Sequence, residues 1–263
     1  MANKVRFFYP NLVDGSGLAF TASSSTTAFD AEHVAVEHPQ VVWKSSSDGA
    51  QHLKIDFSGG TTPTWNTCII HAHNIDTAAT TIDLLSHTAD VKGSATNRGS
   101  FTWSAGPMVL TLGGDVSTDD FFWIDLAHAG SPLGYFTIGR IFLGVYFEPT
   151  TNYVPGRSVG RVDMSVTQTA MNGTESSLQR PDKRVRQAQF PAFTEAEMTN
   201  WRTMGDTLGT HTPLFVGWDT TNHLSTETIY SRFAQPIGKT EQFNFLDGTS
   251  EASTVPTSLI EVL

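Results

Sequence analysis

The stretch YFTIGRIFLGVY at Tyr135–Tyr146 decides the fold class of this 263-residue chain, together with TCIIHAHNI at Thr67–Ile75. Both stretches are mainly apolar and rich in β-branched or aromatic residues, which is typical of buried strands. Each also carries isolated polar residues inside its apolar run. Two such strands, about sixty residues apart, predict a β-sheet core in the first half of the chain.

Further strands are predicted around these two stretches. In His52–Phe57, apolar and polar residues alternate, which indicates a strand with one buried face. Turn-rich segments such as Gly113–Asp115 separate the strands, and no helical period appears between them. The predicted strands are His52–Phe57, Thr67–His73, Thr81–Leu85, Met108–Leu112, Phe121–Ala127 and Tyr135–Phe147. This pattern predicts an antiparallel jelly-roll β-sandwich. Before it, Asn11–Ala31 is interpreted as an extended arm or loop.

The second half of the chain has a different character. Pro149–Gly160 is rich in proline and glycine, so a boundary is predicted between domains 1–148 and 149–263. Thr194 and Glu197 form a capping-box pattern, and Gly209 is placed to end a helix near 195–208. The remaining predicted strands are Pro213–Trp218, Thr226–Phe233, Lys239–Phe245 and Ser258–Leu263. One helix among strands predicts a smaller, β-rich α+β unit of split-barrel type.

Composition excludes several classes of function. The net charge of −10 argues against a broad nucleic-acid surface. The basic cluster Arg180–Arg186 is interpreted as a solvated loop. The chain has no apolar run of 18 residues and no apolar N-terminal leader, so neither a membrane span nor a signal peptide is predicted. A single cysteine, Cys68, rules out an internal disulfide framework.

Catalytic patterns are scarce. His71 and His73 form an H-x-H pair that can begin a zinc site, but the spacing is common, and partly exposed strand-end histidines that make ordinary hydrogen bonds are the favoured interpretation. Asp119 and Asp120 are candidates for a hydrolase pair, yet neighbours on a strand point to opposite faces, which favours a solvated turn. Glycine motifs for nucleotides and the G-x-S-x-G pattern are missing. No catalytic residue, metal or cofactor is therefore predicted.

A binding role fits the aromatic residues better. Trp65, in the loop after Pro63, is predicted to be exposed, where its ring can stack on the apolar face of a sugar. With His73 and Asn74 it forms the candidate glycan-binding set. Structural roles are also open: Asn74 can end its strand. Gly139 and Gly144 indicate a bulge or a close approach of another backbone, and Arg140 is expected to reach a carboxylate or loop carbonyls.

The front half also resembles a known family. Trp43, Asp56, His73–Asn74 and the segment Gly139–Gly144 match an outline similar to discoidin-like, galactose-binding-like jelly rolls of phage tail-tip and baseplate proteins. Animal discoidin lectins usually carry a disulfide, which one cysteine cannot form. The second half resembles the C-terminal units of such proteins at these positions: Asp163, Ser165, Arg184, Arg186, Phe190, Thr194, Pro213, Leu214, Phe215 and Tyr230.

The resemblance implies a virion structural protein of the tail tip, assembled in the host bacterial cytoplasm. Its expected partners are other tail proteins and copies of itself in a ring-like assembly, with a host surface glycan as a further partner. The alternative is a lectin-like carbohydrate-binding module that recognises cell-surface glycans. A hydrolase is the third hypothesis, and it requires the Asp119–Asp120 pair to act.

Overall fold

The computed structural model describes residues 4–262 apart from 77–80, 127–130, 132, 154–156, 170, 173, 191–192, 220–223, 237–241 and 247–249. The predicted strand ends at Ala127, at 239–241 and at Leu263 lie outside the described residues. The chain divides into two compact units, each described by itself below. One comprises Arg6–Phe147 with Gly217–Thr228, and the other holds the remaining segments.

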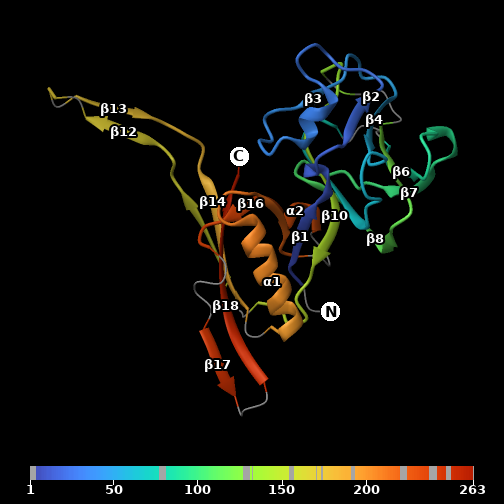
Figure 1. The fold of residues 1–263 in the computed structure, drawn as a ribbon. Coiled ribbons are helices and arrows are strands. Elements are labelled where there is room, and N and C mark those ends of the chain that lie inside the picture. Colours follow the sequence, from blue (N-terminus) through green and yellow to red (C-terminus); the bar gives the residue numbers. More distant parts are fainter. Residues whose placement is uncertain are drawn as a thin grey trace. The chain divides into compact units, whose positions relative to one another are not determined.

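The first unit is the predicted jelly roll (Figure 1). One sheet contains β1 (Arg6–Asn11), β10 (Thr137–Phe147), β5 (Trp65–His73) and β8 (Met108–Val116), with β3 (Trp43–Lys44) also paired to β10. The other contains β2 (Ala19–Ala22), β4 (Gln51–Asp56), β9 (Phe121–Leu126), β6 (Ile82–His87) and β7 (Thr96–Ser100). Short 3-10 helices lie at Leu12–Asp14, Ala31–Ala35 and Lys92–Ser94. The pairings between these strands are antiparallel, so the predicted fold class is confirmed.

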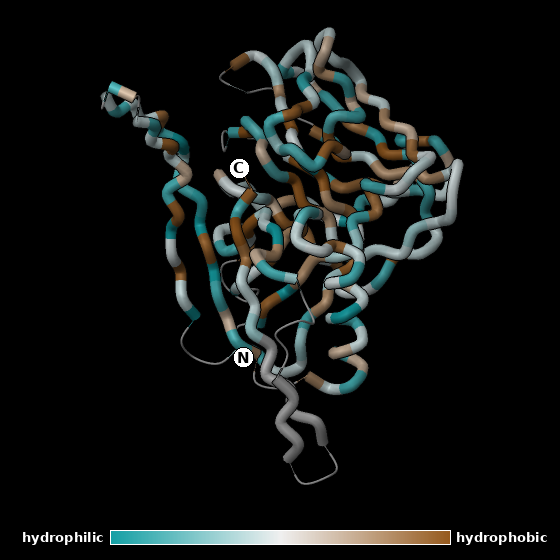
Figure 2. Tube along the Cα trace, turned by 60° about the vertical axis from the view of Figure 1, so that its left-hand side comes forward, coloured by the Kyte–Doolittle hydropathy of each residue, from teal (hydrophilic) through white to brown (hydrophobic). Residues whose placement is uncertain are grey.

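Side chains from both sheets form one core. The inward residues of β4, such as Leu53 and Ile55, alternate with polar ones, as the sequence pattern predicts. Strand β10 is buried over seven consecutive residues, Ile138–Gly144, because both of its faces are covered. Figure 2 shows hydrophobic residues concentrated in the packed strands of this unit. Burial of this contiguous apolar set is the main source of stability for the sandwich.

The outer face of β10 is covered by segments that lie between Pro10 and Pro39. A Cβ added at Gly139 would lie 2.0 Å from the carbonyl oxygen of Pro39, and one at Gly144 would lie 2.2 Å from that of Pro10. Of the two predicted alternatives, the close approach of another backbone is therefore confirmed at both glycines. The interpretation of Asn11–Ala31 as a loop is wrong, since it contains a 3-10 helix and β2 and packs on the sandwich. Its sparse apolar residues gave no period to detect.

The second unit combines a sheet with one helix. Its strands are β11 (Ser158–Val162), β14 (Lys183–Phe190), β18 (Ser250–Glu261), β16 (Thr228–Phe233) and β15 (Leu214–Gly217), in that order, with β17 (Gln242–Leu246) paired to β18. Helix α1 (Glu195–Leu208) begins with the predicted capping box of Thr194 and Glu197, and Gly209 follows it at φ 56°. Trp201 of α1 packs against Phe190 and Phe233. A separate ribbon, β12 (Val166–Thr169) with β13 (Glu175–Leu178), continues beyond β14 (Figure 1).

The largest difference between the predicted and the observed division of the chain concerns one segment. Residues 149–263 were expected to form one domain, but Gly217–Thr228 groups with the jelly roll. This segment contains the short helix α2 (Leu224–Glu227), which packs on β8. No described helix has the length and apolar character needed to cross a membrane.

Candidate functional site

Three parts of the jelly roll meet at one end of the sandwich. Strand β5 ends at His73, β10 begins opposite it with Ile138 paired to His73, and the loop between β7 and β8 carries Trp103. We call the group Lys44, Asn74, Trp103 and Tyr135 the rim. The antiparallel pairing of β5 and β10 brings residues far apart in sequence to this one edge.

His73 fixes the loop that carries Trp103. The backbone N–H of Ile75 donates to its Nδ1 at 3.2 Å, so Nε2 holds the ring proton and donates to the Gly106 carbonyl at 3.0 Å. Burial lowers the pKa of His73, while the hydrogen bond to Gly106 acts in the opposite direction. Both ring nitrogens are thus engaged, and His73 positions the rim. Its predicted contact with a ligand stays a prediction.

Asn74 joins β5 to the start of β10. Its Nδ2 donates to the carbonyl of Tyr135 at 2.9 Å, and its Oδ1 accepts from the backbone N–H of Thr137 at 2.7 Å. The amide keeps one further N–H and one further lone pair for another partner. The side chain therefore ends the strand and also presents polar capacity at the rim.

Trp103 is the tryptophan that the rim exposes. Its side chain is 41% exposed, and its indole N–H donates to the Ile75 carbonyl at 2.9 Å. The bond fixes the edge of the ring while part of its surface stays in water. An immobilised, exposed aromatic surface loses little conformational entropy when a ligand stacks on it.

Lys44 and Tyr135 add polar groups to the rim. The Lys44 ammonium lies 3.7 Å from the centroid of the Tyr135 ring and 5.7 Å from that of Phe29. Cation–π contacts of this kind hold an ammonium without neutralising it. Among the described residues, no carboxylate pairs with Lys44. Its N–H groups can therefore donate to a ligand oxygen.

Trp65 does not lie where the sequence predicted. It is the first residue of β5, its side chain is fully buried, and its ring meets Phe122 edge-on with centroids 5.3 Å apart. The predicted exposure is wrong because the strand begins two residues earlier than expected and turns this ring into the core. A buried ring has no free face for a sugar. Nothing in the sequence around Trp103 distinguished its exposure from that of Trp65.

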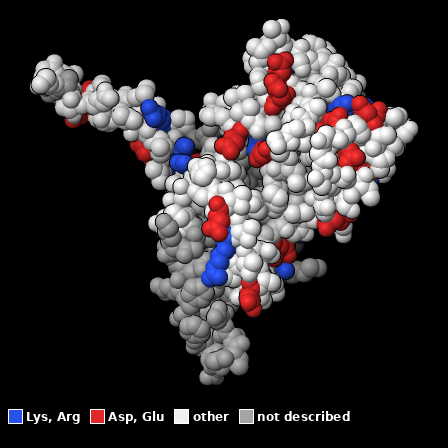
Figure 3. Space-filling model, in the orientation of Figure 1, with Lys and Arg blue, Asp and Glu red and all other residues white. Residues whose placement is uncertain are grey.

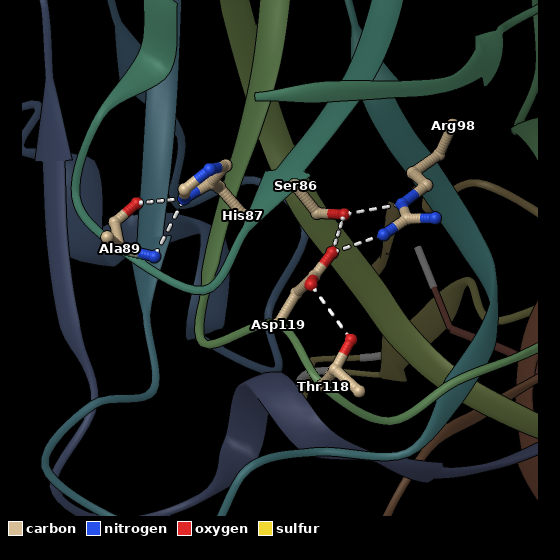
Figure 4. A network of polar contacts seen from close by, with 6 residues as sticks. All are labelled: Ser86, His87, Ala89, Arg98, Thr118 and Asp119. Atoms are coloured by element: carbon tan, nitrogen blue, oxygen red, sulfur yellow. Dashed lines mark hydrogen bonds and ion pairs between the residues drawn. The ribbon is translucent and has the colours of Figure 1, made fainter. Parts of the chain in front are cut away.

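Asp119, the residue weighed for hydrolysis, belongs to a closed polar network (Figure 4). Its Oδ2 accepts from the Ser86 hydroxyl and from Arg98, each at 2.5 Å, and its Oδ1 accepts from Thr118 at 3.1 Å. Although burial acts to raise it, these hydrogen bonds together hold the pKa of Asp119 below its ordinary value. The buried carboxylate therefore links the loop before β9 to strands β6 and β7 through hydrogen bonds. The expectation of a solvated turn is wrong for Asp119.

The remaining reactive groups weighed from the sequence are the Cys68 thiol and the potential metal ligands. Cys68 is buried in β5, and burial raises the pKa of its thiol. Over the described part of the chain, no group of three or more His, Cys, Asp or Glu residues is placed to hold a metal ion.

Protonation of His73 is expected to loosen the rim. Because its pKa in the folded state lies below the ordinary value of 6.5, the unfolded chain binds more protons as pH falls. Stability that is present above pH 6.5 is thus lost as pH falls through 6.5 toward the lower folded pKa. His52, whose pKa burial also lowers, acts in the same direction.

The measurement is the free energy of unfolding of the intact chain from pH 7.5 to 5.5. His73→Gln is expected to flatten this dependence, while His52→Gln leaves the His73 part in place. An equal pH slope in the native chain and in His73→Gln would show that His73 is not the titrating group.

Comparisons with known proteins return solved structures only. No protein-family model matches the sequence, and no curated protein matches it. A chitosan-binding module of a chitosanase/glucanase from Paenibacillus sp. IK-5 is 17% identical, with 51% of this chain and 98% of that chain covered and a TM-score of 0.43. The family 32 carbohydrate-binding module of Clostridium perfringens NanJ, solved with galactose, is 14% identical, with coverages of 54% and 99% and a TM-score of 0.40.

A third match is a Ruminococcus gnavus GH29 fucosidase solved with fucose. It is 13% identical, with a TM-score of 0.44, and the alignment covers 54% of this chain and 28% of the fucosidase. This chain thus spans less than a third of that enzyme. None of these three structures is a phage tail protein, so the tail-tip prediction stays a prediction. Likenesses at this identity and TM-score assign no ligand to this chain.

Proposed function

We propose that this protein binds carbohydrate without transforming it, through the rim of the jelly roll. The observation that carries the proposal is the exposed ring of Trp103, fixed at its edge by the bond to Ile75. A pyranose presents axial C–H groups on one face, and these pack on an aromatic ring. Asn74, Lys44 and the Tyr135 hydroxyl supply hydrogen bonds for the sugar hydroxyls around that ring.

The chemistry of the rim favours a neutral or weakly anionic sugar. Lys44 and Asn74 provide N–H donors, and no carboxylate of the described residues stands among the rim side chains to repel an acidic sugar. The proposal includes no reaction. The carboxylate pair needed for hydrolysis is not free, because Asp119 is bound to Ser86 and Arg98.

The test of this function is Trp103→Ala. We expect binding to a glycan array, quantified by calorimetry on the best ligand, to weaken roughly tenfold, about 1.4 kcal/mol, because the stacking surface is lost. Val91→Ala removes a side chain that is 50% exposed on the β6–β7 loop and serves as the matched control. Equal affinity in Trp103→Ala and the native chain, or a flat array for both, would refute the proposal.

The second candidate function is structural, as a tail-tip subunit of a phage virion. The observation that favours it is the β12–β13 ribbon, whose described residues are exposed on both strands. Ribbons of two strands are marginally stable in water and gain stability when a partner covers them. The partners would be tail proteins and copies of the chain in a ring, with assembly in the host cytoplasm. Immunogold labelling of intact phage particles tests this: label confined to the tail tip supports it, and unlabelled particles contradict it.

A further inference from the structure

Among the described residues, no layer covers the β11 edge of the second unit. From Ser158 to Asp182, every described residue except Ser165 is exposed. Strand β11 pairs with β14 on one side only, and no strand of the described chain pairs with its other side. Its apolar side chains Val159 and Val162 are 56% and 43% exposed. An open strand edge with exposed apolar residues is a site for association.

This edge carries a local excess of positive charge on an acidic protein. Arg161 of β11 lies directly opposite Arg184 of β14. Arg184 is bound to Glu261 through two of its nitrogens, and Arg186 also acts on that carboxylate. One carboxylate, that of Glu261, therefore interacts with two arginines. Figure 3 shows Lys and Arg at the base of the β12–β13 ribbon, whereas Asp and Glu predominate on the visible face of the jelly roll.

Arg161 and Arg180 converge on an open pocket of about 400 Å³, which Asp182 and Glu261 also line. Within the described residues, neither guanidinium has a hydrogen bond or an ion pair. Like charges placed opposite each other on neighbouring strands destabilise a sheet, and an incoming carboxylate relieves this. The pocket thus has the chemistry of a site for an acidic side chain.

The chain itself contains a matching acidic segment. Asp30, Glu32 and Glu37 are all exposed, and no Lys or Arg lies between them. Val36 in the same segment is 38% exposed. The segment thus combines three exposed carboxylates with one exposed apolar side chain, as β11 combines Arg161 with two exposed valines.

We propose that Asp30–Glu37 of one copy docks on β11 and its arginine pocket in a second copy. The contact is head-to-tail, because pairing of β11 with another β11 would bring the Arg161 side chains of both copies together. The inference is independent of glycan binding, since it uses neither Trp103 nor Asn74. A docked pair leaves one acidic segment and one arginine pocket free, so association continues until a ring closes.

The experiment is sedimentation velocity of the full chain at low and high salt. The native chain is expected to form dimers and larger species at low salt, and these dissociate as salt screens the charges. Arg161→Glu/Arg180→Glu and Asp30→Lys/Glu32→Lys are each expected to be monomeric. Arg232→Glu, an exposed residue of β16, makes the same kind of charge change elsewhere and is expected to associate like the native chain.

Mixing the two double variants gives the decisive result. Each keeps the half of the contact that the other lacks, and the two reversed halves are again opposite in charge, so the mixture is expected to form dimers and larger species. A native chain that stays monomeric at low salt, unchanged association of either double variant, or a mixture that stays monomeric overturns the proposal. Circular dichroism checks that each variant folds. Glycan binding by Arg161→Glu/Arg180→Glu is measured as well. If this variant still binds glycan, the result on self-association is independent of the carbohydrate proposal.

Discussion

Replacing Arg140 with methionine is expected to lower the free energy of unfolding by about 3 kcal/mol at pH 7. The Arg140 side chain is 2% exposed, forms an ion pair with Asp14 and donates to the Ala35 carbonyl. Methionine of similar length fills the space but leaves the Asp14 carboxylate and that carbonyl without their donor. The cost falls at the low end for a broken buried pair, because the Asp14 side chain is 34% exposed.

The dependence of this loss on pH distinguishes charge from packing. Burial raises the pKa of Asp14, and Arg140 opposes the increase. Without Arg140 the pKa rises further, so Asp14 takes up a proton at higher pH and its unpaired charge disappears. The gap in stability between the native chain and Arg140→Met is therefore expected to narrow as pH falls from 7 toward 4. Chemical denaturation at several pH values measures it.

Asp14→Asn in the Arg140→Met background provides the control. Removal of the charge is expected to recover part of the lost stability, so the double variant is more stable than Arg140→Met alone. Arg232→Met, at an exposed site, is expected to change stability within about 0.5 kcal/mol. A gap that stays constant from pH 7 to pH 4 would mean that packing, and not the buried charge, dominates the loss.

Much of the fold could be predicted from the hydrophobic periodicity of the strands and from the capping residues of the helix. The alternation in β4, the apolar run of β10 and the capping box of α1 each report local structure that tertiary contacts then reinforce. Gly139, Gly144 and Arg140 were informative for a different reason. A glycine or an arginine inside an apolar strand is unfavourable unless a neighbouring segment requires it, and here Pro39, Pro10 and Asp14 do.

Other elements left no local signal. Strand β2 and the 3-10 helices of the first forty residues are held by contacts with β4 and β10, which their own sequence does not encode. Strand β7, TNRGS, has no apolar face at all. The residues of the candidate site could be predicted even less well. Trp65 is buried because β5 begins at this residue, whereas Trp103 is exposed in the loop between β7 and β8, and the local sequence does not distinguish the two cases.

Gly139→Ala is expected to destabilise the chain by about 3 kcal/mol, near the upper end of the usual cost of overpacking. The new Cβ would lie 2.0 Å from the Pro39 carbonyl oxygen and 2.9 Å from the Cβ of Ala72. The first neighbour is backbone, which a rotamer change cannot move aside. The segment around Pro39 must therefore shift away from β10, and it carries the Ala35 carbonyl that accepts from Arg140.

Two further variants locate the cause. Gly114→Ala in β8 adds a Cβ with no atom within 4 Å and is expected to change stability within about 0.5 kcal/mol. Ala72→Gly relieves a left-handed residue, at φ 55°, and is expected to stabilise the native chain by about 1 kcal/mol. It also removes the contact at 2.9 Å but leaves the one with Pro39, so Ala72→Gly/Gly139→Ala should remain well below Ala72→Gly in unfolding free energy. If the double variant instead matches Ala72→Gly, the Pro39 segment is not what makes glycine necessary at position 139.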